Sequence, residues 1–200
     1  MSRDLDIVRA RIYAVTPANT PPYRWTGQDG FVRITDNLLR LTAANGLEGW
    51  ASNTSNAPHA DGAAEPKRSA ADRLHEIALQ VLGASALERE AVSERLLRTC
   101  DDPRRRAESL IDIALWDLMA RAANQPLWQM LGGAREAIPA YASTPVLDTV
   151  EAYVAYVGDL AERGYRAAKL HTQCDPDWDL AMINAVNAAH GKRMRFMLDV

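Results

Sequence analysis

A lysine and a histidine stand two residues apart in the stretch AAKLHT, residues 167–172, at the end of a predicted strand. Successive side chains of a β-strand point to opposite faces, so Lys169 and His171 share one face and Ala168 and Leu170 share the other. Imidazole titrates near neutral pH, and lysine does so when burial or a nearby cation lowers its pKa. The pair is therefore a candidate for acid–base chemistry.

An aspartate occupies the same place in the next predicted strand. Asp199 lies at the carboxyl end of the stretch RMRFMLDV, residues 193–200. Ligands and catalytic groups of parallel α/β folds collect beyond the carboxyl ends of the strands, so Asp199 is predicted to meet Lys169 and His171 at one rim. A carboxylate there can hold a hard cation such as Mg²⁺, beside a base that removes a proton from carbon. The alternative is an internal salt bridge between Lys169 and Asp199, with His171 hydrogen-bonded beside it.

The elements that must position these residues alternate along the second half of the chain. The predicted order is strand 137–143, helix 149–164, strand 165–172, helix 176–191 and strand 193–200. Strands separated by helices of this length indicate parallel βαβ units. In the last strand, Met194, Phe196 and Leu198 are expected to pack under the helices.

The first half has the pattern of an α+β domain. A strand is predicted at residues 5–15, followed by two strands joined around Asn45 and Gly46, a pair suited to the positive φ angles of a tight hairpin turn. Helices are predicted at residues 67–82 and 87–97, and a longer helix begins near residue 104. Apolar residues at the spacing of a core-facing helical stripe are Ala107, Leu110, Ile111, Ala114, Leu115, Leu118, Met119 and Ala122.

The composition is that of an ordinary folded protein. The 200 residues are 48% hydrophobic and 24% charged, with a net charge of −3, so no basic face for nucleic acid is expected. The sequence contains no run of about 18 apolar residues and no apolar signal-peptide core, which predicts a cytoplasmic protein without a membrane partner. The two cysteines, Cys100 and Cys174, lack the spacing of a zinc site.

The stretch from Ser109 to Thr144, SLIDIALWDLMARAANQPLWQMLGGAREAIPAYAST, resembles the interdomain linker of the mandelate racemase/muconate lactonizing branch of the enolase superfamily. The segment Lys169-Leu170-His171 is similar to the Lys-x-Lys motif of that branch, and the final LDV is similar to its third barrel strand. The resemblance implies an α+β capping domain at residues 1–135. It also implies the start of a (β/α)7β TIM-like barrel at residues 136–200, with the first three strands present.

The resemblance also implies a chemistry. Members of this superfamily use a Lys or His base together with Mg²⁺, so Asp199 is expected to bind Mg²⁺ while a base abstracts the proton α to a carboxylate. His171 replaces the second lysine of the motif, so the role of base moves to His171, with Lys169 stabilising negative charge beside it. Dehydration of a sugar acid, a hydro-lyase reaction, is the most specific expectation. A racemase or epimerase that uses the same enolate is the alternative.

Five further residues are candidates for contact with a small carboxylate substrate. Arg24, Trp25 and His59 lie on two loops that match the family's capping loops, and Tyr141 and Ser143 end the first predicted barrel strand. The alternative is that they are solvated loop residues. The resemblance further implies a homo-oligomer assembled through the capping domains.

The predicted barrel region is short. Residues 136–200 are far fewer than the about 250 residues of a complete barrel domain. The chain is therefore expected to be the N-terminal part of a longer enzyme and to be inactive by itself. The remaining metal carboxylates and a second acid/base residue are expected beyond Val200. A non-catalytic fragment that acts through protein interaction is the alternative from another class.

Overall fold

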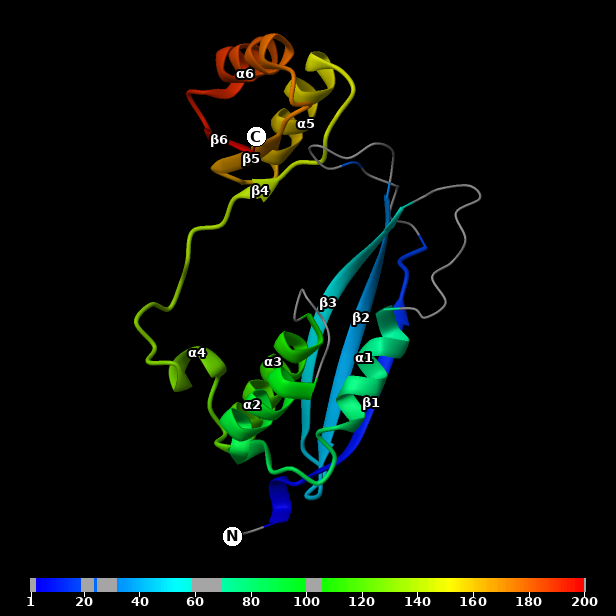
Figure 1. The fold of residues 1–200 in the computed structure, drawn as a ribbon. Helices are drawn as coiled ribbons and strands as arrows, with labels where there is room; N and C mark the ends of the chain where they lie inside the picture. The colour runs from blue at the N-terminus through cyan, green and yellow to red at the C-terminus, as the bar shows by residue number, and fades with distance from the viewer. Residues whose placement is uncertain (1–2, 19–23, 25–31, 59–69, 100–105, 200) are drawn as a thin grey trace. The chain divides into compact units, whose positions relative to one another are not determined.

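The computed structural model of the protein describes residues 3–18, 24, 32–58, 70–99 and 106–199. These residues divide into two compact units, each with its own hydrophobic core. Residues 3–18, 34–58, 70–99 and 106–136 belong to the first unit. Residues 137–199 belong to the second unit together with Arg24, Val32 and Arg33. Figure 1 shows the helices and strands of both units.

The first unit contains a three-stranded sheet in the order β1-β2-β3. Its strands are β1 (Ile7–Val15), β2 (Val32–Ala43) and β3 (Glu48–Pro58). β1 pairs antiparallel with β2, with Tyr13 opposite Leu38. The predicted hairpin is present, but of the two turn residues only Gly46 has a positive φ, +86°. Asn45 contributes through its side chain instead, because its Oδ1 accepts a hydrogen bond of 3.0 Å from the backbone N–H of Leu47.

Helices complete the first unit and supply most of its buried core residues. They are the short 3-10 helices η1 (Arg3–Leu5) and η2 (Ala86–Glu88), and the α-helices α1 (Ala70–Leu79), α2 (Arg89–Thr99), α3 (Arg106–Ala122) and α4 (Leu127–Met130). The predicted stripe on α3 is buried from Ala107 to Leu118 and packs with Leu39 and Leu41 of β2. Ala122 is exposed, because it lies in the last turn of the helix, beyond this core. The α+β architecture expected for this half is confirmed.

Gly49 is the point of closest approach between β3 and α3. A Cβ atom at residue 49 would lie 2.1 Å from the Ala114 carbonyl oxygen and 2.7 Å from Leu118 Cβ. We therefore expect Gly49→Ala to lower the free energy of unfolding by about 3 kcal/mol, because helix and strand must move apart. Urea unfolding measures this change. The matched control is Ser52→Ala, at an exposed position of the same strand, for which a change within about 0.5 kcal/mol is expected. Equal effects of the two variants would contradict the close approach.

The second unit is a parallel sheet in the order β4-β5-β6 with two helices between the strands. Its elements are β4 (Ala142–Ser143), α5 (Val150–Glu162), β5 (Ala167–His171), α6 (Pro176–His190) and β6 (Arg195–Asp199). Both helices begin at side-chain caps whose residue types favour this position. Thr149 accepts a hydrogen bond from the N–H of Ala152, and Asp175 accepts from the N–H groups of Asp177 and Trp178. The predicted βαβ pattern is confirmed.

One face of this parallel sheet packs against α5 and α6. Ala168 and Leu170 of β5 are fully buried in a core with Tyr153, Val157 and Met182 of the two helices. Strand alternation then turns Lys169 and His171 to the opposite face, as the sequence predicts. The fold therefore separates the side chains of β5 that hold the unit together from the side chains that can meet a ligand.

Two strand predictions are wrong in part. Residues 137–141 are not in a strand, and Ile138 is 79% exposed. Pro139 lies in this segment and has no N–H to donate to a strand ladder. Leu198, expected to pack under the helices, is 43% exposed because β6 is the outer strand of the described sheet and pairs only with β5. None of the helices in the described ranges has the length and apolar character needed to traverse a lipid bilayer.

Candidate active site

Lys169, His171 and Asp199 meet at the carboxyl ends of β5 and β6. The strand register places His171 directly opposite Asp199. Lys169 Nζ donates a hydrogen bond of 2.6 Å to Asp199 Oδ2, and His171 Nε2 lies 3.4 Å from the same oxygen. The structure thus brings together the three residues selected from the sequence, and it includes the Lys169–Asp199 ion pair of the alternative interpretation.

The lysine and the aspartate of this cluster stabilise each other's charged forms. The hydrogen bond from Lys169, followed by its positive charge, holds the pKa of Asp199 below its usual value. The hydrogen bond to Asp199 raises the pKa of Lys169, although partial burial acts in the opposite direction. Both groups are therefore ionised at neutral pH. In this arrangement Lys169 supplies a fixed positive charge and is a poor proton acceptor.

The surroundings of His171 favour its neutral form, in contrast to those of Lys169 and Asp199. Its side chain is 6% exposed, and this burial is the main cause that lowers its pKa from the ordinary value of 6.5. The charge of Lys169 lowers the pKa further, while Asp199 and a contact with Thr144 raise it in part. A buried imidazole with a lowered pKa is neutral at pH 7 and can accept a proton.

We expect His171 to titrate below pH 6.5 in the folded protein. Replacing Lys169 by methionine removes a positive neighbour, which makes the imidazolium form less costly, so the pKa of His171 is expected to rise in Lys169→Met. Titration of labelled histidine ring signals by NMR measures both values. A pKa of His171 at or above 6.5 in the wild type, or a pKa that does not change in Lys169→Met, would contradict this electrostatic description.

Three hydroxyl groups fix the main chain around the cluster. Tyr153 Oη donates to the His171 carbonyl oxygen at 2.6 Å, and the His171 N–H donates to Thr144 Oγ1 at 3.2 Å. Thr172 Oγ1 donates to the Asp199 carbonyl oxygen at 3.3 Å. Sequence analysis missed all three residues. Thr144 directly follows one predicted strand and Thr172 ends another, which was an available signal. Tyr153 lies inside an apolar helix pattern and gave none.

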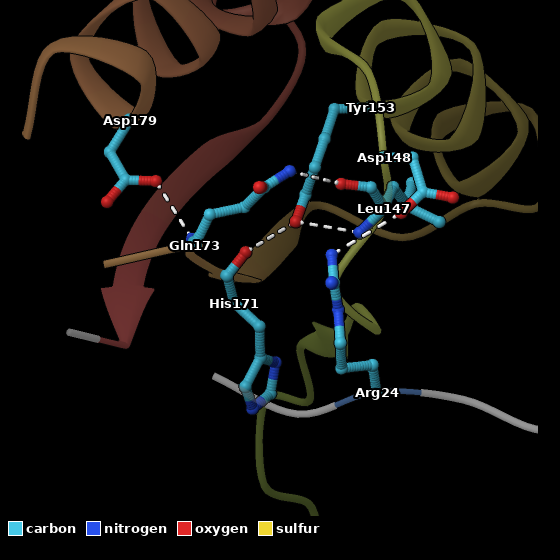
Figure 2. A network of polar contacts seen from close by, with 7 residues as sticks. All are labelled: Arg24, Leu147, Asp148, Tyr153, His171, Gln173 and Asp179. Atoms are coloured by element: carbon cyan, nitrogen blue, oxygen red, sulfur yellow. Dashed lines mark hydrogen bonds and ion pairs between the residues drawn. The ribbon is translucent and has the colours of Figure 1, made fainter. Parts of the chain in front are cut away.

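Arg24 joins this unit through the segment that precedes α5. Its guanidinium lies 3.4 Å from Asp148 Oδ1, and its carbonyl oxygen accepts a hydrogen bond of 2.9 Å from the Val146 N–H. Figure 2 shows Arg24 and Asp148 in the same polar network as Tyr153 and His171.

Of the other four proposed substrate residues, the structure describes two. Tyr141 is 48% exposed, and its electrostatic influence reaches Lys169, whose pKa it helps to raise. Ser143 is exposed at the end of β4, in register with Lys169. Trp25 and His59 lie outside the described residues. The structure therefore brings Tyr141 and Ser143 next to the cluster.

The cluster offers one hard oxygen ligand for a metal ion. Asp199 is half-exposed at the strand end, and its ionised carboxylate is the type of group that Mg²⁺ prefers. Mg²⁺ usually binds through one or two carboxylates and completes its shell with water and substrate oxygens. Within the described ranges, no group of three or more His, Cys, Asp or Glu side chains is arranged to hold a metal ion. Asp199 therefore fits as one ligand of such a site.

Sequence comparison relates the chain to known enzymes. Residues 28–132, slightly more than half of the chain, match the family described as mandelate racemase / muconate lactonizing enzyme, N-terminal domain. An N-succinylamino acid racemase of Thermus thermophilus is 36% identical over 117 residues, which are 58% of this chain and 31% of that protein. A D-mannonate dehydratase of Novosphingobium aromaticivorans is 39% identical over 71 residues, 34% of this chain and 17% of that protein.

Structural comparison extends the likeness to nearly the whole chain. A solved structure from Pseudovibrio sp., of the mandelate racemase/muconate lactonizing enzyme type, has a TM-score of 0.88 and 36% identity, over 98% of this chain and 51% of its own. A structure of the same type from Roseovarius nubinhibens, in complex with magnesium, has a TM-score of 0.77 and 25% identity, over 96% and 52%. The chain thus spans about half the length of these solved relatives. It belongs to the mandelate racemase/muconate lactonizing enzyme family of the enolase superfamily.

Proposed function

We propose that the protein forms part of a Mg²⁺-dependent enzyme that removes the proton α to a carboxylate, and that its reaction is the dehydration of a sugar acid. The observation that carries the proposal is the meeting of Lys169, His171 and Asp199 at the carboxyl ends of two parallel strands. In parallel α/β folds, ligands collect at this rim of the sheet. A structural ion pair between Lys169 and Asp199 does not account for the buried imidazole of His171 beside it.

His171 is the proposed base. Its imidazole is buried and its pKa is lowered, so the neutral form that accepts a proton predominates at pH 7. It lies on the same face of β5 as Lys169 and next to Asp199, so a substrate carboxylate drawn to Lys169 would bring its α-carbon close to this ring. The ion pair with Asp199 keeps Lys169 protonated, which suits it to bind and stabilise negative charge rather than to remove a proton.

Asp199 is the proposed metal-binding residue. Its carboxylate is ionised and lies at the strand end, where substrate oxygens can complete the shell of a cation. When bound, Mg²⁺ supplies positive charge that stabilises the negative charge developing on the substrate carboxylate. Lys169 adds a second positive charge to the same region, and its hydrogen bond holds Asp199 in place.

A racemase or epimerase is the second candidate, and a specific observation favours it. The relative from Thermus thermophilus, which matches 58% of this chain, carries the name of a racemase, whereas the dehydratase relatives match shorter stretches. Both reactions begin with removal of the same α-proton. They differ afterwards, because a dehydratase expels a β-hydroxyl group and a racemase returns a proton to the other face of the carbon.

The first unit is the proposed capping domain, and Arg24, which belongs to the second unit, is a proposed substrate contact. Its guanidinium is anchored on Asp148, beside the network that holds His171, so it could meet the end of the substrate remote from the reacting carbon. Tyr141 and Ser143 are proposed to line the same site, and Trp25 and His59 to act with them. We further propose that the complete enzyme is a homo-oligomer.

The test is a screen of acid sugars and N-acylamino acids with Mg²⁺, performed on the complete gene product. Formation of a 2-keto acid from an acid sugar supports the dehydratase. Inversion at the α-carbon without a keto product supports the racemase. If neither class of acid shows α-proton loss in the presence of Mg²⁺, the proposed function is wrong.

A further inference from the structure

We propose that Tyr153, together with Thr144, is a positioning residue that holds the base His171 in place through its main chain. The two hydroxyl groups bind the two polar groups of one residue's backbone: Tyr153 Oη donates to the His171 carbonyl oxygen, and Thr144 Oγ1 accepts from the His171 N–H. This inference rests on the proposed function only for its catalytic consequence. The position of the ring can be tested without a substrate.

The hydroxyl of Tyr153 is buried, so its hydrogen bonds must offset the free-energy cost of removing it from water. The tyrosine side chain is fully buried in the core of the second unit, and burial raises the pKa of its hydroxyl, so it is a proton donor at neutral pH. Burying a hydroxyl without hydrogen bonds costs about 1–3 kcal/mol, whereas phenylalanine would fill the same space without a polar group. Here the hydroxyl makes two bonds, to the His171 carbonyl at 2.6 Å and from the Leu147 N–H at 3.0 Å.

The ring of Tyr153 is itself held from two sides. It belongs to α5, whose N-terminus is capped by Thr149, and it packs edge-on against Trp178 of α6 with a centroid distance of 5.7 Å. Leu147, which donates to the Tyr153 hydroxyl, is also bound by Gln173. Gln173 Nε2 donates to the Leu147 carbonyl oxygen at 3.0 Å, and the Gln173 N–H donates to Asp179 Oδ1 at 3.0 Å. Figure 2 shows the two Gln173 hydrogen bonds beside Tyr153 and His171.

Fixing this main chain also fixes the imidazole. His171 is the last residue of β5, so Tyr153 and Thr144 bind its backbone where the strand ends. Its Nε2 lies 3.4 Å from Asp199 Oδ2, and a change in the backbone angles of His171 would swing the ring away from that oxygen and from the proposed substrate position. A displacement of 1 Å at a reacting group can reduce turnover by about 100-fold. The hydroxyls therefore act on the reaction through His171 and have no contact of their own with substrate.

The first experiment compares Tyr153→Phe with Tyr156→Phe in the complete enzyme. Both variants remove one hydroxyl from α5 and keep a ring that packs against the same core, but Tyr156 is not a member of the network around His171. We expect Tyr153→Phe to lower kcat by about 10- to 100-fold with little change in KM, because the base is displaced while substrate binding is kept. Tyr156→Phe is expected to keep the wild-type kcat.

The second measurement reads the histidine ring directly and needs no substrate. The ring signals of His171 are identified in spectra of ¹³C-labelled histidine by their absence in His171→Asn, and are recorded at one fixed pH of about 8, where the imidazole is neutral. We expect them to shift in Tyr153→Phe and to keep their wild-type positions in Tyr156→Phe. Because no substrate is used, this result stands even if the complete enzyme shows none of the proposed reactions.

Thr144 provides an independent pair of variants in case Tyr153→Phe does not fold. Thr144→Val removes the acceptor of the His171 N–H at nearly constant volume and is expected to move the ring signals and lower kcat, whereas Thr144→Ser keeps the hydroxyl and is expected to restore both. The proposal is overturned if the His171 signals of the folded Tyr153→Phe or Thr144→Val variant coincide with the wild type. A fall in kcat no larger than that of the control variants overturns it as well.

Discussion

Asp199→Asn is expected to abolish turnover of the complete enzyme and to weaken its binding of Mg²⁺. Asparagine keeps the size of the side chain but removes the negative charge that would hold the cation. Loss of about 4 kcal/mol of charge stabilisation in the transition state corresponds to a fall of about 1,000-fold in kcat. The fold should survive, since asparagine has nearly the same size and the carboxylate is half-exposed at the end of its strand. Calorimetric titration with Mg²⁺ and steady-state kinetics measure the two effects.

The matched control for this substitution is Asp177→Asn. Asp177 is an exposed aspartate in the first turn of α6, so its replacement makes the same chemical change away from the cluster. We expect wild-type turnover and wild-type Mg²⁺ affinity in the control. Unchanged Mg²⁺ affinity in Asp199→Asn would contradict the assignment of Asp199 as a metal-binding residue. The Lys169–Asp199 pair would then be a structural ion pair.

The replacements His171→Asn and Lys169→Met are expected to damage the enzyme in different ways. Removal of a general base typically costs a factor of about 100 to 10,000, so His171→Asn should retain almost no turnover at any pH. Lys169→Met removes a positive charge that stabilises the transition state, which typically costs about 100- to 1,000-fold, but it leaves the base in place. Steady-state kinetics across pH separates the two outcomes.

The pH profile gives the sign of each effect. In the wild type, activity should fall as pH decreases through the pKa of His171, which burial and Lys169 hold below 6.5, because protonated imidazole cannot accept a proton. In Lys169→Met this limb should move to higher pH, since the neighbouring positive charge is gone. A residual activity in His171→Asn that still falls along the same acid limb would contradict the role of His171.

The placement of the cluster could be predicted because strand geometry is strict. Alternation along β5 fixes the shared face of Lys169 and His171, and parallel strands with intervening helices fix their common rim with Asp199. The apolar period of α3 and the turn at Gly46 were equally accessible, since each depends on a short stretch of sequence. These features are local, and local patterns carry most of the information that a single sequence contains.

The features that could not be predicted from the sequence depend on contacts between distant segments. Tyr153 lies 18 residues from His171, and its side chain is indistinguishable by pattern from the other apolar residues of α5. The ion pair of Arg24 with Asp148 spans 124 residues, and both residues belong to the second unit. Residues 137–141 illustrate the opposite error, because the stretch AIPAYAS is predicted as one strand although only Ala142 and Ser143 pair with β5. Pairing partners and hydrogen-bond acceptors cannot be deduced from such patterns.

The central claim is that His171 removes the proton α to the carboxylate of the substrate. It is tested most directly by following the α-proton signal of the acid identified in the screen, by NMR in D₂O with Mg²⁺, for the wild type, His171→Asn and Lys169→Met. The prediction is that the signal disappears with the wild type, by exchange or by elimination, that it persists with His171→Asn, and that it decays slowly with Lys169→Met. Decay with His171→Asn and persistence with Lys169→Met would contradict the account and assign the base to the lysine.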